Sequence, residues 1–157
     1  MPPFTLFTGA DNTTLTNALL APGSSIVVTA ASIALKASGP DAVNFYDGSL
    51  LPLGIGPGLL LSSGTTPGND NTVGSFGQDN SGISGFANGD PNIDAVVNTV
   101  FKTPSYDATT LSFVFTVSDP TATSVSFDVV FRSDEFPEWV NQSVDCAIVM
   151  VNGVNYP

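Results

Sequence analysis

Apolar side chains recur at every second position in two stretches of the second half of the chain, residues 111–117 and residues 125–131. This period is typical of a β-strand that buries one face, because successive side chains of a strand point to opposite sides. The dipeptide Asp119-Pro120 lies between the two stretches and is typical of a turn. The pattern predicts two strands that each bury one aromatic face.

The last apolar stretch lacks this alternation. Residues 145–151 are almost uniformly apolar after Asp145, as in a strand that is covered on both faces. Asn152 and Gly153 follow, and this pair favours a hairpin turn. Because only residues 154–157 remain for the returning strand, we expect that the chain lacks its native C-terminal continuation, or that this C-terminal edge pairs with another molecule.

The first half carries weaker strand signals. The β-branched residues 25–29 and the apolar residues 33–35 predict two strands or one bent strand. Residues 45–92 are rich in Gly, Ser, Asn and Pro, with a short apolar island at residues 58–61. This composition predicts an ordered, loop-rich surface rather than a linker.

Two short helices are also expected. Residues 12–20 place leucines at helical spacing behind polar capping residues, and Pro22 follows as a stop signal. Apolar residues recur at helical intervals again in residues 93–101, which predicts a helix that starts near Pro91 with Asp90 as its N-cap. A chain of 157 residues is about one domain long, so we expect one domain over residues 1–157. The predicted fold is all-β and mainly antiparallel, a β-sandwich or jelly-roll-like domain with one or two short helices.

The charge balance narrows the set of partners. Three basic residues against 14 acidic ones give a net charge of −11, so phosphate backbones and anionic lipid headgroups are repelled and nucleic acid is not an expected partner. No run of about 18 apolar residues is present, so we expect no membrane insertion by this segment. The unneutralised carboxylates make calcium the first cofactor to consider.

Several enzyme classes are excluded by composition. The chain contains no histidine, which removes Ser-His and Cys-His mechanisms and the commonest general base. Glu135 and Glu138 could act as the paired carboxylates of a glycoside hydrolase, but the surrounding loop is crowded with acids, and we expect no catalytic activity. The lone Cys146 lies in an apolar stretch and is expected to be a buried, inert thiol.

The sharpest site hypothesis concerns one acidic loop. Five oxygen-bearing side chains fall close together between two predicted strands, a density that a bound cation would relieve. The alternative is that these groups are solvated or cap backbone N–H groups in the loop. The predicted calcium ligands are Asp134, Glu135, Glu138, Asn141 and Asp145.

Aromatic side chains near this loop offer a second hypothesis. Trp139 and Phe136, together with Tyr106, could stack on a sugar ring if they are exposed. The alternative is that they roof the hydrophobic core. A further acidic set, formed by Asp90, Asp94 and Asp107, is expected to act structurally through the helix cap.

The order of these segments resembles the choice-of-anchor L domain family across nearly the whole chain. The resemblance is carried by the early leucine-rich helix and by residues 58–64 (GLLLSSG), 89–94 (GDPNID), 106–113 (YDATTLSF) and 131–141 (FRSDEFPEWVN). Asp134, Phe136 and Trp139 depart conservatively from the family's most specific block, and Val144 stands where Asn is usual. The family occurs in bacterial surface and secreted proteins with varied anchoring modules, which implies location rather than activity.

Together these observations predict a non-catalytic extracellular module on the surface of a bacterium. Its expected roles are adhesion to a surface or matrix macromolecule, matrix attachment, or assembly, with calcium as a stabilising ion. An alternative is a carbohydrate-binding module with a glycan as its partner. A third reading is a structural subunit of a surface layer or filament that self-associates through the C-terminal edge.

Overall fold

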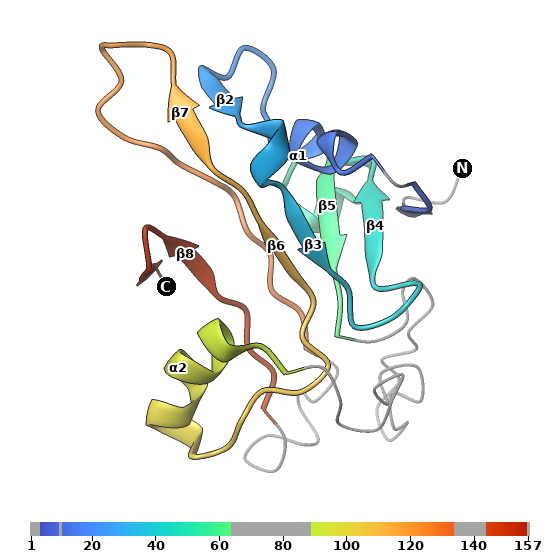
Figure 1. The fold of residues 1–157 in the computed structure, drawn as a ribbon. Helices are drawn as coiled ribbons and strands as arrows, with labels where there is room; N and C mark the ends of the chain where they lie inside the picture. Colours follow the sequence, from blue (N-terminus) through green and yellow to red (C-terminus); the bar gives the residue numbers. More distant parts are fainter. Residues whose placement is uncertain (1–3, 10, 64–88, 134–143, 157) are drawn as a thin grey trace.

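A computed structural model of the 157-residue chain describes residues 4–9, 11–63, 89–133 and 144–156. In these residues the structure consists of short strands, two helices and two single turns of 3-10 helix (Figure 1). In chain order they are β1 (Phe4–Leu6), α1 (Thr13–Leu19), β2 (Ile26–Val28), a 3-10 turn (Ala30–Ser32), β3 (Ala34–Lys36), β4 (Val43–Tyr46), a 3-10 turn (Leu51–Leu53), β5 (Gly58–Leu61), α2 (Pro91–Phe101), β6 (Thr110–Ser112), β7 (Phe115–Val117), β8 (Val149–Val151) and β9 (Val154–Tyr156).

All strand pairings in the described residues are antiparallel. The order β1-β4-β5 forms a three-stranded sheet, while β2 pairs with β7, β3 with β6, and β8 with β9. The all-β, mainly antiparallel class with two short helices is confirmed. The sandwich or jelly-roll arrangement of the sheets stays a prediction.

The three-stranded sheet carries much of the buried side-chain volume. Val43, Asn44 and Tyr46 on β4 are buried, and so is Leu15 of α1, which packs against β5. The ring of Tyr46 lies 5.5 Å from the ring of Phe4 between centroids, and its hydroxyl is hydrogen-bonded to the backbone of Leu50. Strands β1 and β4 were not predicted, because each is too short to establish a period of two.

The predicted helix over residues 12–20 is confirmed as α1, but its capping differs from the expectation. The side chain of Asn12 makes no capping hydrogen bond. Instead, the backbone N–H of Thr13 donates to the carboxylate of Asp11 at 2.9 Å. The predicted strands at residues 25–29 and 33–35 are confirmed as β2 and β3, separated by a 3-10 turn.

A small hydroxyl network joins the β3–β6 pair to the three-stranded sheet. The Oγ1 of Thr109 donates to the carbonyl oxygen of Ser62 at 2.6 Å, and the hydroxyl of Ser38 donates to the same carbonyl at 3.1 Å. The backbone N–H of Ser38 also donates to Thr109 Oγ1 at 3.0 Å. Three chain segments far apart in sequence are therefore fixed to one another at the ends of β3, β5 and β6.

The aromatic strand predicted over residues 125–131 is wrong. The segment from Thr123 to Phe131 is extended but forms no strand, and its side chains are exposed. The turn before it is the predicted one, closed by the N–H of Ala122 donating to the carbonyl of Asp119 at 3.3 Å. The tight turns of hairpins are mostly of types I′ and II′, which need a positive φ at their first central residue. Pro120 holds this position and its φ is fixed at a negative value, so the turn is of another type. Turns of the ordinary types I and II splay the two flanking strands, which opposes strand pairing here.

The strand predicted over residues 145–151, covered on both faces, is also wrong in part. Only Val149–Val151 is a strand, and the residues from Val144 to Ala147 are exposed. In the described structure β8 pairs only with β9. Val149 and Val151 are half-buried whereas Met150 is exposed, so the strand is not covered on both faces. The hairpin turn itself is confirmed: Asn152 and Gly153 have φ values of 50° and 78°, as a mirror-image turn requires. No helix among the described residues is long and apolar enough to span a bilayer.

Candidate functional site

Most of the predicted calcium ligands lie outside the described residues. Asp134, Glu135, Glu138 and Asn141 fall in the range 134–143, and only Asp145 is placed. The Asp145 carboxylate is exposed and accepts a hydrogen bond of 2.6 Å from the hydroxyl of Ser133. This bond holds the two ends of the acidic loop together. Within the described ranges, no group of three or more His, Cys, Asp or Glu side chains is arranged to hold a metal ion.

Of the three aromatic residues predicted to stack on a sugar, only one lies within the described structure. Phe136 and Trp139 lie outside the described residues, whereas Tyr106 lies between α2 and β6 with 46% of its surface exposed. The ring of Tyr106 is therefore accessible from solvent. This exposure is what stacking on a sugar would require of it.

The second acidic set acts at the start of α2. The Asp90 carboxylate accepts hydrogen bonds from the N–H groups of Asn92 at 2.9 Å and Ile93 at 3.4 Å, which confirms it as the N-cap. Asp94 accepts from both the backbone N–H and the hydroxyl of Ser105, at 2.5 and 2.7 Å. The N–H and hydroxyl of Ser105, in that order, hold the pKa of Asp94 below its usual value, and the nearby Lys36 ammonium adds to the effect.

Further contacts tie this helix start to the sheet. The Lys36 ammonium on β3 donates to the carbonyl of Gly89 at 2.5 Å, and the N–H of Asp90 donates to the Ser105 hydroxyl at 2.9 Å. A Cβ atom on Gly89 would lie 2.5 Å from the carbonyl oxygen of Ser105, so the close approach requires glycine there. Asp90, Asp94 and Ser105 therefore form a structural clip between the start of α2 and the segment that follows the helix, and the Lys36 bond ties this clip to β3.

Asp107 stands apart from this clip. It is only 8% exposed, has a left-handed φ of 49°, and its Oδ1 has no hydrogen-bond partner among the described residues. Within the described part of the chain it forms no metal-binding group with Asp90 and Asp94. The second acidic set is thus a helix cap, a clip and a separate buried carboxylate, not one site.

The prediction that Cys146 is buried is wrong. The side chain is exposed and lies before β8 rather than in a strand. It is exposed because this part of the chain pairs with nothing among the described residues. Partial desolvation, and then the negative charge of the adjacent Asp145, raise the pKa of the thiol.

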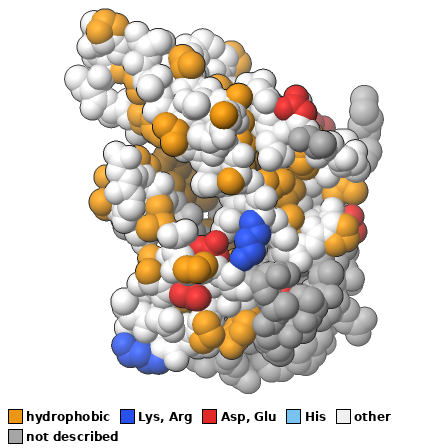
Figure 2. Space-filling view, viewed as in Figure 1, with side chains coloured by type: hydrophobic (Ala, Val, Ile, Leu, Met, Phe, Trp, Pro, Cys, Tyr) orange, Lys and Arg blue, Asp and Glu red, His pale blue; other side chains and the backbone are white. Residues whose placement is uncertain are grey.

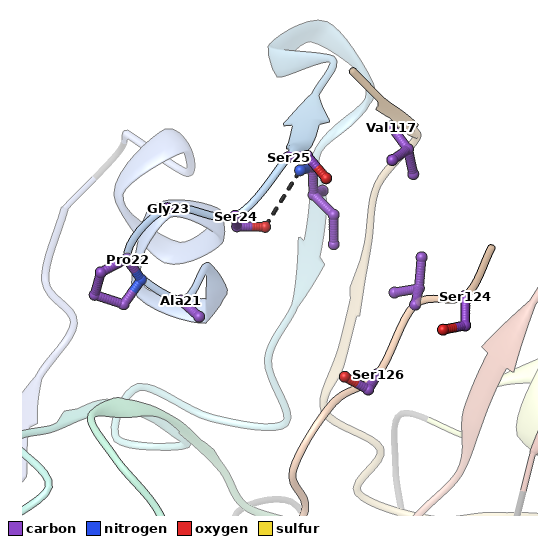
Figure 3. A pocket seen from close by; sticks show the side chains of 10 residues that line it. Ala21, Pro22, Gly23, Ser24, Ser25, Val117, Ser124 and Ser126 are labelled. Carbon is purple, nitrogen blue, oxygen red and sulfur yellow. Dashed lines mark hydrogen bonds between the residues drawn. The ribbon is translucent and has the colours of Figure 1, made fainter. Parts of the chain in front are cut away.

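An open pocket lies where the chain leaves α1 and approaches β7 (Figure 3). Its volume is about 340 Å³. The lining combines serine hydroxyls with aliphatic side chains and contains no charged residue. The lining residues are Ala21, Pro22, Gly23, Ser24, Ser25, Ile26, Val117, Ser124, Val125 and Ser126.

The pocket continues into an exposed apolar surface that sequence reasoning assigned to the core. In Figure 1 the chain turns after β7 and returns alongside it. Figure 2 shows hydrophobic side chains scattered over the surface and around a recess in the left half of the view. We call residues 123–131 the edge segment. The exposed large apolar side chains of β7, its approach and the edge segment are Val114, Val117, Val125, Phe127, Val129, Val130 and Phe131.

The backbone of the edge segment is as open as its side chains. Among the described residues, its N–H and C=O groups take part in no strand pairing and no other backbone hydrogen bond. An unpaired strand edge with alternating apolar side chains is a template for another strand. The proline turn at Asp119-Pro120 is the sequence signal that could have revealed this face.

The comparisons with known proteins agree with the resemblance seen in the sequence. The family model of the choice-of-anchor L domain matches residues 5–155. No curated protein and no solved structure matches the chain.

Proposed function

This chain belongs to the choice-of-anchor L domain family, and from that premise we propose that it is a non-catalytic module that serves adhesion, matrix attachment or assembly on a bacterial surface. The family is one of surface-associated bacterial modules and is not a known enzyme family. The finer role is supported by one observation above others, the exposed apolar face formed by β7 and the edge segment.

The physical case for a binding role rests on the cost of leaving this face bare. Apolar surface removed from water contributes roughly 25 cal/mol per Å², so a partner that covers exposed apolar side chains gains free energy. Phe127 is 52% exposed and Phe131 is 53% exposed. A partner that covers these two rings would remove their apolar surface from water, which would stabilise the complex.

The test is carried out on bacterial cells that produce the protein. Intact cells should be labelled by an antibody against the chain, and their attachment to a surface or to one another should fall when Phe127 and Phe131 are both changed to Asp. Val100→Asp, on the exposed face of α2, is the matched control and should leave attachment unchanged. Failure to label intact cells would contradict the surface location, and unchanged attachment of the double variant would contradict the role of this face.

Calcium is proposed as a stabilising ion of the acidic loop. Support comes from the density of oxygen donors in residues 134–145 and from the bond between Ser133 and Asp145 that closes the loop. The ion would draw the carboxylates together and offset their mutual repulsion.

A glycan is the second candidate partner, favoured by the exposure of Tyr106. Titration of the protein with soluble polysaccharides, followed by tryptophan fluorescence, would report on the single Trp139. If the protein binds a glycan, the fluorescence should change to a saturating value, and the Tyr106→Ala variant should need more polysaccharide to reach it.

A further inference from the structure

The edge segment exposes several large apolar side chains that a partner can cover. Phe127, Val129 and Phe131 are 52%, 55% and 53% exposed, and Val125 is 45% exposed. These four residues alternate along the segment, so their side chains lie on one face when the segment is a strand.

The distribution of charge indicates which partner can approach this face. Residues 110–133 contain two acidic residues and one basic residue, Asp119, Asp128 and Arg132, a net charge of −1 against −11 for the chain. Two copies of the chain repel one another where acidic residues are dense and least where they are sparse. A basic partner would instead be attracted to the acidic remainder of the molecule. The face around the edge segment is therefore one that a second copy can cover at low electrostatic cost.

We propose that the edge segment pairs with the edge segment of a second copy as an antiparallel β-strand. The inference rests on the proposed function, of which it specifies the assembly role and the partner. Pairing would satisfy backbone groups that are unpaired within the described structure and would bury alternate apolar side chains against those of the copy.

The sequence of the segment selects a register. When Phe127 lies opposite Phe127 of the partner subunit, Val125 lies opposite Val129, and Thr123 opposite Phe131. The apolar face of one strand then meets only apolar side chains and one threonine. On the other face Asp128 lies opposite Ser126, a hydroxyl donor, rather than opposite the second Asp128. Registers that oppose the two Asp128 carboxylates are disfavoured, because like charges directly opposite destabilise a strand pair.

The pocket next to β7 is compatible with this register. Ser124 and Ser126 line the pocket and also belong to the edge segment (Figure 3). In the proposed pairing, the residue opposite Ser124 is Val130 of the partner subunit. An uncharged, partly aliphatic pocket at this position tolerates an incoming aliphatic side chain, whereas it offers no counter-charge to an ionised one.

Sedimentation velocity over a wide concentration range tests the pairing. We expect a reversible monomer–dimer equilibrium that strengthens as salt screens the net charge. Phe127→Lys should abolish the dimer, because two ammonium groups would meet at its centre, whereas Val100→Lys, at a 68% exposed position on α2, should leave it intact. A chain that stays monomeric at every concentration and salt level would overturn the proposal, as would a dimer that Phe127→Lys does not weaken.

Disulfide trapping tests the register. In a Cys146→Ser background, Phe127→Cys should form a disulfide-linked dimer on mild oxidation, since directly opposite Cβ atoms lie about 4.5–5.5 Å apart. Asp128→Cys should crosslink less, because it faces Ser126, and Val100→Cys should crosslink least. Equal trapping at all three positions would overturn this register.

The two proposals fail in different ways. A monomeric protein whose Phe127 and Phe131 variants still lose cell attachment would refute pairing with a second copy and leave the surface role standing. A dimer trapped through Phe127→Cys in a protein that intact cells do not display would support pairing with a second copy and refute the surface role.

Discussion

Asp94 shows how a single carboxylate holds the start of a helix to the segment that follows it. Its two hydrogen bonds from Ser105 and the nearby Lys36 ammonium favour the charged form in the folded state. Gly89 permits the close approach of the backbone on which this arrangement depends. The clip is a structural feature of α2 rather than part of a catalytic site.

A pH dependence of stability follows from the lowered pKa of Asp94. Since this pKa is lower in the folded than in the unfolded state, the contribution is fully present above the unfolded value and is lost as pH falls through the folded one. Asp94→Asn should therefore lower the melting temperature at neutral pH, and the difference from the wild type should shrink at acidic pH. Asp128→Asn, on the exposed edge segment, is the control. A difference that persists unchanged at low pH would show that the charge of Asp94 does not stabilise the fold.

The exposure of Cys146 gives a second prediction for a single residue. The thiol of the native protein should react fully with a thiol reagent without denaturant, because the side chain is exposed. The rate at mildly alkaline pH should be lower than that of a small free thiol, since the raised pKa reduces the thiolate fraction. A thiol that reacts only after unfolding would contradict the exposure of this segment.

The elements of the chain differ in how locally they are determined. Helix α2 has a complete local signal, with Asp90 as N-cap and Pro91 at its first position. The β8–β9 hairpin likewise follows from Asn152 and Gly153. The edge segment has a strong strand pattern, but it follows a turn that splays it from β7, so it forms no strand pairing within the described residues.

The N-cap of α2 can be tested by substitution. Asp90→Ala removes the acceptor for the N–H groups of Asn92 and Ile93 and should cost about 1 kcal/mol of unfolding free energy, measured by urea denaturation. Asp90→Asn preserves a capping oxygen and should cost much less. Equal losses in both variants would point to the charge of Asp90 rather than to its capping bonds.

At the scale of the whole molecule, the net charge of −11 governs both stability and association. Lys36, Lys102 and Arg132 are the three basic residues, so most carboxylates have no basic partner to neutralise them. A bound cation and screening by salt are the two ways to lower this repulsion. Both should favour the compact state and its assembly.

Calcium should therefore stabilise the protein if the acidic loop binds it. An ion that binds only the native state adds roughly 2.7 kcal/mol at a hundredfold excess over its dissociation constant, which calorimetry with calcium and with a chelator would detect. The shift should disappear in Asp145→Ala and Glu135→Ala and persist in Asp119→Asn. No shift in the wild type would remove calcium from the proposal.

The sequence by itself determined the features that depend on neighbouring residues. The two helices, the cap at Asp90, the Asn152-Gly153 hairpin and the family were all predictable, because capping, turn geometry and motif order are local properties. The candidate calcium loop stays a prediction, since four of its five residues lie outside the described structure.

Only the tertiary structure decided which apolar residues are covered. The alternation in residues 125–131 is the same whether a strand packs in a core or lies open at an edge, because periodicity encodes the faces of a strand but not its partners. The short strands β1 and β4 are built by pairing across the chain, with Phe4 opposite Tyr46, and carry no period of their own. The exposure of Phe127 and Cys146 therefore had to come from the packing, which depends on contacts between residues far apart in the sequence.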